Sequence, residues 1–394
     1  MKTIDKINFK GEKVIIRVDY NVPMDEENRI TDSTRILASK ETIMTVIKNG
    51  GCVVLLTHIG RPNGVDPQYS CALIIDEVTK ILGQKVLFCE NTIGKKAEEA
   101  VMNLIPGQII LMENLRFHPA EIKGEITFAK HLAKLGTVYV NDAFGAAHRA
   151  HASTTIIAQF FKKKYFGKLL EKEVKAIDKV LNTGKKPILA ILGGAKISSK
   201  ITVIESLLGS VNDILIGGGM AYTFIKSQGG KIGDSICEPN FFEFAFNIIE
   251  IAKSKGVKIH LPKDVIIADK FSDSANTKIC DIRKIPDGWQ GLDYGPNSLK
   301  QIKPLIKNSK TILWNGPLGV FEFDSFASGT IKLGEFISDA TLNGSFSLVG
   351  GGDSVAAVKK FGFFEKMSYV STGGGAMLES LEGRDLPGIK ALEY

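Results

Sequence analysis

Cysteine is scarce in this sequence of 394 residues, and the five that occur lie far apart. No two of them form a C-x-x-C pair, so the sequence shows no sign of a disulfide framework or a thiolate metal site. We expect all five to be small core residues: Cys52, Cys71, Cys89, Cys237 and Cys280.

Long apolar runs are also missing. No segment reaches the roughly 18 uninterrupted apolar residues that a membrane helix needs, and the opening MKTIDKINFKGEKV lacks the apolar stretch of a secretory signal. With 44% apolar and 24% charged residues, the composition is that of a soluble globular protein. We expect a cytoplasmic protein without a membrane partner.

Concentrated basic charge is absent too, although the net charge is +7. Lysines are scattered along the chain, the tight cluster at 162 to 164 is short, and no helix-turn-helix or zinc-finger spacing occurs. A nucleic-acid partner is therefore disfavoured.

The standard nucleotide fingerprints are missing as well. The stretch ILGGAKISSK (191 to 200) resembles a phosphate-binding loop, yet it lacks the second glycine of the Walker pattern. The stretch GGGMAY (217 to 222) has Tyr222 where the dinucleotide fingerprint has its third glycine, which argues against a Rossmann dehydrogenase.

What is present is an alternation of short apolar runs with helix-length segments, the pattern of parallel α/β sheets. Such a long chain exceeds one ordinary core, and Leu169, Leu170, Val174, Ile177 and Leu181 fall at helical spacing. We predict two doubly wound, Rossmann-like α/β domains, 1 to 166 and 183 to 384, joined by a helix at 167 to 182, with a cleft between them. The predicted strands are 13 to 19, 52 to 57, 85 to 89, 108 to 113 and 137 to 142, then 187 to 192, 213 to 218, 257 to 262, 311 to 316, 346 to 350 and 367 to 371.

Arginine is rare, with eight residues against 42 lysines, yet several arginines are placed where ligands bind in α/β sheets. Arg61, Arg116 and Arg149 follow predicted strands, and Arg35 begins a predicted helix. A guanidinium can bind phosphate or carboxylate through two parallel hydrogen bonds, which lysine cannot do. We predict a site for a small anion. A histidine metal site is the alternative, but H-x-x-x-H spacing is absent among the histidines of these loops: His58, His118, His148 and His151.

The second half carries glycine after its strands. The turns are GGAKISSK (193 to 200), GGGMAY (217 to 222), NGPLGVFE (315 to 322), GGGDS (350 to 354) and TGGGA (372 to 376). Together with Lys196, Lys200, Glu322 and Asp353, these turns predict a nucleotide whose phosphates meet helix N-termini. Asp353 beside phosphates indicates Mg²⁺ between them, because like charges repel.

Lys196 and Lys200 are four positions apart, so we predict that they share one helical face. The buried stripe of that helix would be Ile197, Ile201, Ile204 and Leu208.

These motifs resemble the phosphoglycerate kinase family along nearly the whole chain. RVDYNVP, HIGRP, ENLRFH, NDAFGAAHRAHAS, GGAKISSK, IGGGMAY, WNGPLGVFE, GGGDS and STGGGA occur in the family's order. Two departures are visible: Ser354 stands where threonine is common, and QFFKKKYFG (159 to 167) is more basic than the family's usual segment. An inactive nucleotide-binding regulator would lack some site residues, and none is missing.

The resemblance implies a site residue by residue, and a C-terminal tail (about 385 to 394) packed on the first domain. It implies that 3-phosphoglycerate binds Asp19, Asn21, Arg35, His58, Ile59, Gly60, Arg61, Arg116 and Arg149. ATP or ADP would bind Gly194, Ala195, Lys196, Lys200, Gly217, Gly218, Gly291, Asn315, Pro317, Val320, Glu322, Gly351, Gly352, Asp353 and Ser354, with Asp353 at Mg²⁺. The catalytic residues would be Arg35, Lys200, Gly351 and Gly352.

The implied reaction moves the acyl phosphate of 1,3-bisphosphoglycerate to ADP, in glycolysis and gluconeogenesis, in a monomeric enzyme. In reverse the acceptor is an ionised carboxylate, which explains why the sequence shows no poised general base. Catalysis would rest on positioning and charge, by direct in-line transfer with closure about a hinge.

Overall fold

The computed structural model describes residues 1 to 393, and the chain divides into two compact units. Unit 1 is Met1–Lys175 together with the residues from Asp385 onward, and unit 2 is Ala176–Arg384. The division falls inside helix α6 (Lys168–Asp178), which continues as a π-helical turn at Lys179–Thr183. The sequence had suggested boundaries at the ends of this helix.

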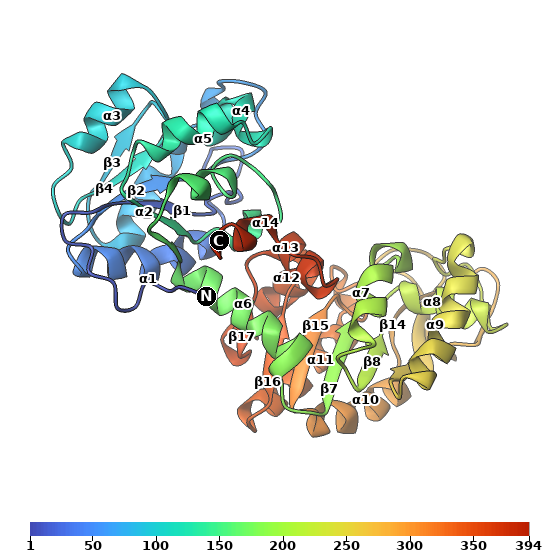
Figure 1. Cartoon of the computed structure of the whole chain (residues 1–394). Helices are drawn as coiled ribbons and strands as arrows, with labels where there is room; N and C mark the ends of the chain where they lie inside the picture. The colour runs from blue at the N-terminus through green and yellow to red at the C-terminus, as the bar shows by residue number, and fades with distance from the viewer. Residues whose placement is uncertain (394) are drawn as a thin grey trace. The chain divides into compact units, whose positions relative to one another are not determined.

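Unit 1 is built on a six-stranded parallel sheet with the order β3-β4-β2-β1-β5-β6, of which Figure 1 labels the first four strands. The five predicted strands are confirmed, and a short sixth strand from the basic segment pairs with β5. The bounds are β1 (Lys13–Arg17), β2 (Cys52–Leu56), β3 (Val86–Cys89), β4 (Ile109–Met112), β5 (Val138–Asn141) and β6 (Lys164–Phe166).

The helices of unit 1 connect these strands. They are α1 (Thr34–Lys48), α2 (Ile75–Leu82), α3 (Lys95–Met102), α4 (Pro119–Ile122), α5 (Ile126–Ala133) and α14 (Pro387–Lys390). Shorter 3₁₀ turns lie at Pro67–Tyr69, Cys71–Ile74, Leu115–Phe117, Phe144–Ala146 and Ile156–Phe160. The last segment of the chain contacts the loop after β5, because the amide of Gly388 donates to the carbonyl of Ala147 at 2.8 Å.

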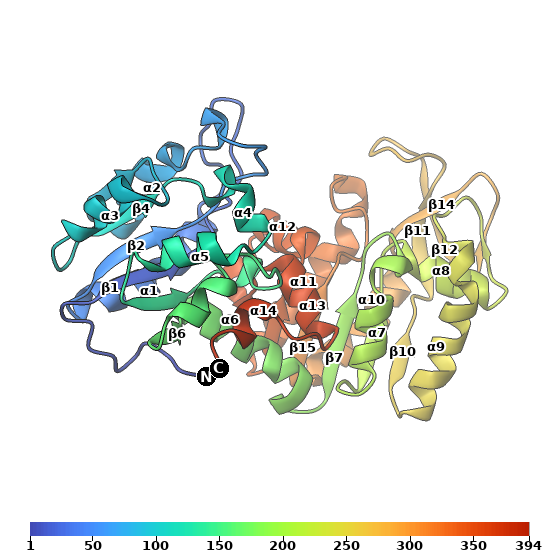
Figure 2. The ribbon, with the colours of Figure 1, turned by 45° about the horizontal axis from the view of Figure 1, so that its top comes forward.

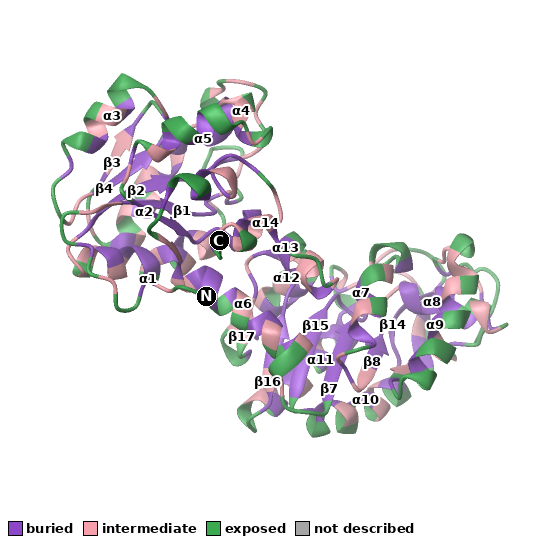
Figure 3. Ribbon diagram, in the orientation of Figure 1, coloured by how far each residue is buried: buried purple, intermediate pink, exposed green. Residues whose placement is uncertain are grey.

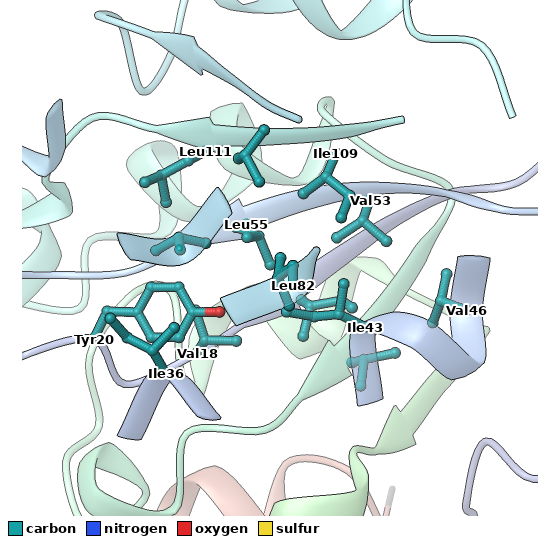
Figure 4. Packing of buried hydrophobic residues seen from close by; sticks show 14 of the residues in the cluster. Val18, Tyr20, Ile36, Ile43, Val46, Val53, Leu55, Leu82, Ile109 and Leu111 are labelled. Carbon is teal, nitrogen blue, oxygen red and sulfur yellow. The ribbon is translucent and has the colours of Figure 1, made fainter. Parts of the chain in front are cut away.

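The core of unit 1 follows from strand alternation. Side chains of β2 at Val53 and Leu55 pack on the same side of the sheet as Ile43 and Val46 of α1 (Figure 4). All four are fully buried. At about 25 cal/mol per Å² of apolar surface, such burial is the main stabilising contribution to the sheet and its covering helices.

Unit 2 has its own six-stranded parallel sheet with the order β10-β8-β7-β15-β16-β17. The predicted strands are again confirmed. Their bounds are β7 (Ile188–Leu192), β8 (Asp213–Ile216), β10 (Lys258–His260), β15 (Thr311–Asn315), β16 (Phe346–Val349) and β17 (Tyr369–Val370). The inner strands of both sheets are buried (Figure 3), as expected for parallel strands covered by helices.

The helices of unit 2 are α7 (Ile201–Leu207), α8 (Met220–Ser227), α9 (Phe242–Ser254), α10 (Pro296–Asn308), α11 (Ser328–Leu342), α12 (Gly352–Lys360) and α13 (Gly374–Leu381). Its core includes Trp314 of β15, which is fully buried and donates its Nε1–H to the carbonyl of Gly316 at 2.9 Å. Two of the helices, α10 and α11, supply Ile306 and Ile337 to this core.

A small antiparallel sheet was not predicted from the sequence. It has the order β12-β11-β14 and lies beside α8 (Figure 2). A two-stranded pair, β9 (Lys231–Ile232) with β13 (Lys284–Ile285), accompanies it. The strands are β11 (Asp264–Ala268), β12 (Thr277–Asp281) and β14 (Gln290–Tyr294).

The prediction that all five cysteines are core residues was wrong for two of them. Cys52, Cys71 and Cys89 are buried, whereas Cys237 and Cys280 are partly exposed. Cys280 lies on β12, an edge strand of the small sheet whose side chains are mostly exposed.

Across residues 1 to 393, none of the helices combines the length and the apolar composition needed to span a bilayer.

The topology of each sheet singles out one strand. In unit 1 the chain runs outward from β1 on both sides, because β1 pairs with both β2 and β5. In unit 2 the same position belongs to β7, which pairs with both β8 and β15. Ligands in open α/β sheets bind at the carboxyl ends of strands at this switch point. The loops that follow β1 and β7 are DYN (19 to 21) and GGAKISSK (193 to 200), which are both predicted site segments.

Candidate functional site

The loops after β1, β2, β4 and β5 bring several basic side chains together at one edge of the unit 1 sheet. We call this group the arginine cluster: Arg35, Arg61, Arg116, Arg149 and His58. Hydrogen bonds link its members through the backbone. Arg35 Nη1 donates to the carbonyl of Asn21 at 2.7 Å, the side chain of Asn21 accepts from the amide of Gly60 at 2.8 Å, and Arg116 donates to the carbonyl of Gly60 at 2.5 Å.

Arg35 lies in the first turn of α1 and is held by the loop after β1. Its Nη1 is 3.5 Å from Asp19 Oδ2, and the Arg35 side chain remains 34% exposed. Asp19 also accepts weakly from the amide of Asn21, at 3.4 Å. The guanidinium is therefore oriented by its neighbours and keeps donors free for a ligand.

Arg116 is 5% exposed in a 3₁₀ turn, and Asn114 caps that turn by accepting from the Arg116 amide at 3.0 Å. Asn114 also donates to the carbonyl of Ile59 at 2.8 Å, which ties the loop after β4 to the loop after β2. Burial lowers the pKa of Arg116 to about 10, and Arg149 and Arg17 push it in the same direction. The carboxylate of Glu121 opposes this shift.

Gly60 has a structural reason to be glycine. Its φ is +61°, and a Cβ there would lie 2.2 Å from the ring of Tyr69. The turn can therefore bring its backbone amide and carbonyl between Asn21 and Arg116 because no side chain intervenes.

The histidines divide into two groups. Burial, followed by the charges of Arg17 and Arg116, holds the pKa of His58 well below its usual value. Burial and the same arginines lower the pKa of His151 to about 4. His118 stands apart, because it contacts Thr92 at 2.5 Å and burial alone lowers its pKa.

The other predicted residues of this half differ in exposure. Arg61 is exposed, and its positive charge contributes to lowering the pKa of Arg116. Arg149 is half-buried and donates from Nε to His148 Nε2 at 3.1 Å. These two arginines are less buried than Arg116, which is held by its hydrogen bond to the carbonyl of Gly60.

Sequence reasoning missed three buried polar residues behind the cluster. Arg17, Glu121 and Ser153 are at most 1% exposed. A signal for Arg17 was available, because it interrupts the apolar run VIIRVD, and a charge inside a central strand needs a partner.

In unit 2, a cavity of about 610 Å³ opens among the glycine turns. Eight of the predicted nucleotide residues line it: Gly194, Ala195, Gly218, Gly291, Pro317, Val320, Glu322 and Asp353. Its remaining lining is mostly apolar and includes Leu292, Leu318 and Phe323. A flat apolar ring and a chain of phosphates can both be accommodated by such a lining.

A second group of predicted residues surrounds Asn315 at the end of β15. Asn315 is 1% exposed, accepts from Lys200 Nζ through Oδ1 and donates from Nδ2 to the carbonyl of Gly350 at 2.6 Å. Ser354 Oγ accepts from the amide of Gly316 at 2.5 Å. The hydroxyl of Ser354 therefore accepts a hydrogen bond from the backbone, and the hydroxyl of a threonine could accept the same bond.

Close backbone approaches explain the glycines near β7. A Cβ at Gly193 would lie 2.0 Å from the carbonyl of Pro317, and one at Gly217 would lie 2.3 Å from Leu318 Cδ2. Gly218 has φ +66° and its Cβ would meet the backbone of Gly194 at 2.6 Å. Side chains at these positions would push the turns apart and change the cavity.

The prediction that Lys196 and Lys200 share a helical face was wrong. Ile197–Ser199 form a 3₁₀ turn and α7 begins at Ile201, so Lys196 is extended and Lys200 occupies the helix cap. Lys196 is exposed, while Lys200 is partly buried. Burial lowers the pKa of Lys200, and the carboxylates of Asp353 and Glu382 oppose that shift.

The donor set around Asp353 suits Mg²⁺ only together with phosphates. Asp353 lies in the first turn of α12, lines the cavity and is exposed. Within residues 1 to 393, no group of three histidine, cysteine, aspartate or glutamate side chains could enclose a metal ion. Mg²⁺ in nucleotide sites commonly takes one or two carboxylates plus phosphate oxygens, and Asp353 fits that arrangement.

An arginine cluster in one unit and a glycine-lined cavity in the other are the kinds of site that an α/β phosphotransferase with an anionic substrate and a nucleotide needs. Comparison with known proteins identifies the family. The family model described as phosphoglycerate kinase matches residues 4–384. The chain belongs to the phosphoglycerate kinase family.

Individual phosphoglycerate kinases are similar to this chain over nearly their whole lengths. The phosphoglycerate kinase of Porphyromonas gingivalis is 47% identical, with 99% of this chain and 100% of that protein covered. Cytosolic phosphoglycerate kinase 3 of Arabidopsis thaliana is 48% identical, with coverage of 99% and 98%. The solved structure of phosphoglycerate kinase from Coxiella burnetii superposes with a TM-score of 0.91 at 39% identity, covering 99% of this chain and 98% of that one.

Proposed function

We propose that this kinase transfers the acyl phosphate of 1,3-bisphosphoglycerate to ADP, reversibly, giving 3-phosphoglycerate and ATP. The observation that carries the proposal is the separation of chemistry between the units. Unit 1 offers side-chain guanidinium groups and unit 2 offers glycine turns, lysine and helix ends. Each is suited to a different phosphorylated ligand.

The arginine cluster and its supporting loop hold 3-phosphoglycerate in this proposal. Arg61, Arg116 and Arg149 would contact the phosphate or carboxylate oxygens, and Arg35 would reach the group that is transferred. Supporting contacts would come from Asp19, Asn21, His58, Ile59 and Gly60. Of these, Asp19 and Asn21 contact Arg35, Gly60 accepts from Arg116, and Ile59 accepts from Asn114. The low pKa of Arg116 supports an anion as the occupant, since an anion would restore a favourable environment for its charge.

The cavity of unit 2 would hold the nucleotide. Its apolar wall, which includes Gly291 and Val320, suits the base, and Glu322 suits the ribose hydroxyls. The phosphates would meet Lys196, Lys200 and the N-terminus of α12 at Gly351 and Gly352. A partial positive charge at a helix N-terminus favours phosphate at this place. Gly194, Ala195, Gly217, Gly218, Asn315, Pro317, Asp353 and Ser354 complete the proposed set.

Catalysis then needs no general base, because the carboxylate of 3-phosphoglycerate is already ionised. Arg35 and Lys200 would stabilise the negative charge that spreads over the transferring phosphoryl group, and the amides of Gly351 and Gly352 would donate to it. Mg²⁺ bound to Asp353 and the nucleotide would supply further charge neutralisation. Direct transfer requires reacting atoms within about 3 to 3.5 Å, so we propose that the enzyme closes about a hinge at α6 during turnover.

We further propose a monomeric enzyme of the cytoplasm that acts on small molecules and not on nucleic acid. The cytosolic names of the relatives from Arabidopsis thaliana and Nicotiana tabacum support the compartment.

A coupled assay tests the proposal. The purified protein is supplied with 3-phosphoglycerate and MgATP, and the 1,3-bisphosphoglycerate formed is reduced by glyceraldehyde-3-phosphate dehydrogenase with NADH. We expect NADH oxidation that requires both substrates and disappears when the metal is chelated. Binding of both substrates without turnover would instead identify an inactive regulator.

A further inference from the structure

A continuous chain of buried hydrogen bonds runs behind the arginine cluster, from Glu121 to His58. Glu121 accepts from Ser153 twice, from the hydroxyl at 2.6 Å and from the amide at 3.0 Å. Ser153 Oγ lies 2.8 Å from Arg17 Nε, and Arg17 Nη2 lies 3.0 Å from His58 Nδ1. All four side chains are buried, with His58 at 4% exposed and the others at 1% or less.

The proton positions along this chain follow from its chemistry. A guanidinium has only donors, so the Ser153 oxygen must accept from Arg17 Nε and its own proton must go to Glu121. For the same reason, His58 Nδ1 must accept from Arg17 Nη2. An imidazole that accepts at Nδ1 carries its proton at Nε2 and is neutral. No hydrogen bond within residues 1 to 393 engages that Nε2–H, so it is left as a donor for a ligand.

The charges around His58 favour this form. Arg17, Arg116 and Arg149 all disfavour a further positive charge there, and together with burial they keep the pKa of His58 well below its usual value. Glu121 is the buried carboxylate that compensates Arg17, and that arginine in turn opposes the rise that burial causes in the pKa of Glu121.

We propose that Ser153 and Glu121 are positioning residues that act through Arg17 to hold His58 in a single neutral tautomer, with Nε2–H available to the bound anion. The proposal rests on the proposed function in one respect, because it takes the anion of unit 1 to be 3-phosphoglycerate. Arg17 is itself 1% exposed, so its part is to orient His58 and not to touch the ligand.

Nitrogen NMR of the free protein tests the proposal without any substrate. In protein labelled with ¹⁵N-histidine, two-bond correlation spectra distinguish protonated from unprotonated ring nitrogens. In the wild-type protein we expect His58 to show an unprotonated Nδ1 and a protonated Nε2, unchanged from about pH 5.5 to 8.5. In Ser153→Ala the guanidinium of Arg17 keeps its hydrogen bond to the carbonyl of Val18 but loses the one from Nε to Ser153 Oγ. We then expect the two His58 nitrogen shifts to move toward each other as the tautomers mix.

The matched control is Tyr139→Phe. It removes another buried hydrogen bond to the same residue, from Tyr139 Oη to the carbonyl of Ser153 at 2.8 Å, and leaves the Ser153 hydroxyl in place. We expect the wild-type tautomer in this variant. A protonated Nδ1 in the wild type, or equal mixing in both variants, would overturn the proposal.

Calorimetric titration supplies the second readout. Ser153→Ala should bind 3-phosphoglycerate about tenfold more weakly, because the Nε2–H of His58 would no longer be held as a donor to the anionic ligand. The same variant should bind MgADP as the wild type does. Ser153→Thr, which keeps the hydroxyl, should recover most of the affinity. Altered tautomers with unchanged affinity for 3-phosphoglycerate would overturn the role in ligand binding. Absence of 3-phosphoglycerate binding in the wild type, with a fixed tautomer, would refute the proposed function instead.

Discussion

Replacing Gly351 by alanine should damage unit 2 more than the same change at its neighbour Gly352. Gly351 has φ +95° and ψ 144°, a conformation that residues with a side chain rarely adopt. A Cβ there would also lie 2.5 Å from Asn315 Nδ2, the atom that donates to the carbonyl of Gly350. Gly352 is the first residue of α12, and a Cβ on it would meet nothing within 4 Å.

The magnitude follows from these two effects. The backbone strain costs about 1 to 3 kcal/mol, and loss of the buried hydrogen bond costs about 1 kcal/mol. The sum is about 2 to 4 kcal/mol, which for a unit of this size lowers the melting temperature by about 4 to 16 °C. Gly352→Ala should match the wild type or gain up to about 1 kcal/mol, because alanine favours a helix over glycine.

Differential scanning calorimetry of the two variants measures this difference, and titration with MgADP measures its consequence. Displacement of Asn315 also releases Lys200, so Gly351→Ala should bind the nucleotide at least about tenfold more weakly. Wild-type stability in Gly351→Ala, or equal destabilisation of both variants, would refute the assignment of strain to Gly351.

Four other outcomes are expected. Lys200→Ala and Arg35→Ala should each lower turnover by about 10² to 10³ with little change in substrate affinity; steady-state kinetics with half the activity retained would remove that residue from the mechanism. Arg61→Lys and Arg149→Lys should weaken 3-phosphoglycerate but not ADP in calorimetry, since the fork is lost and the charge kept; equal losses would contradict the division of ligands. Burial raises the pKa of Asp142 to about 7, above its unfolded value of about 3.9, so unit 1 should lose stability as pH rises from about 4 to 7. Urea unfolding of Asp142→Asn across that range should show a weaker dependence on pH, and an unchanged slope would exclude this carboxyl. Small-angle scattering should show greater compaction with both substrates than with either alone, whereas a constant radius of gyration in an active mixture would rule out a large closure.

The two parallel sheets could be predicted because their strands are continuous apolar runs separated by helix-length segments. The same pattern does not reveal β6, whose segment KYF follows lysines and forms a strand only by pairing with β5. The antiparallel sheet around β11 was missed for a related reason, since its edge strand β12 is mostly exposed and has no apolar run.

The candidate site, too, was predictable in some of its features and not in others. Arginine after a strand and glycine at a strand-to-helix turn are local features, so the sequence determined which loops carry the chemistry and, with the family's motifs, which reaction they serve. The helical face predicted for Lys196 and Lys200 failed because a local spacing cannot tell a 3₁₀ turn from the first turn of a helix.

Only the tertiary structure decided what stands behind those loops. Arg17, Ser153 and Glu121 are far apart in the chain, and nothing in their immediate neighbours indicates that they share hydrogen bonds. Burial is the reason that they must meet, because a charge removed from water needs its partners wherever they lie in the sequence. The sequence by itself thus determined the two parallel sheets, the loops that follow their strands and the family. The packing of distant segments determined the hydrogen-bond partners of the buried polar groups and the direction in which burial moves their pKa values.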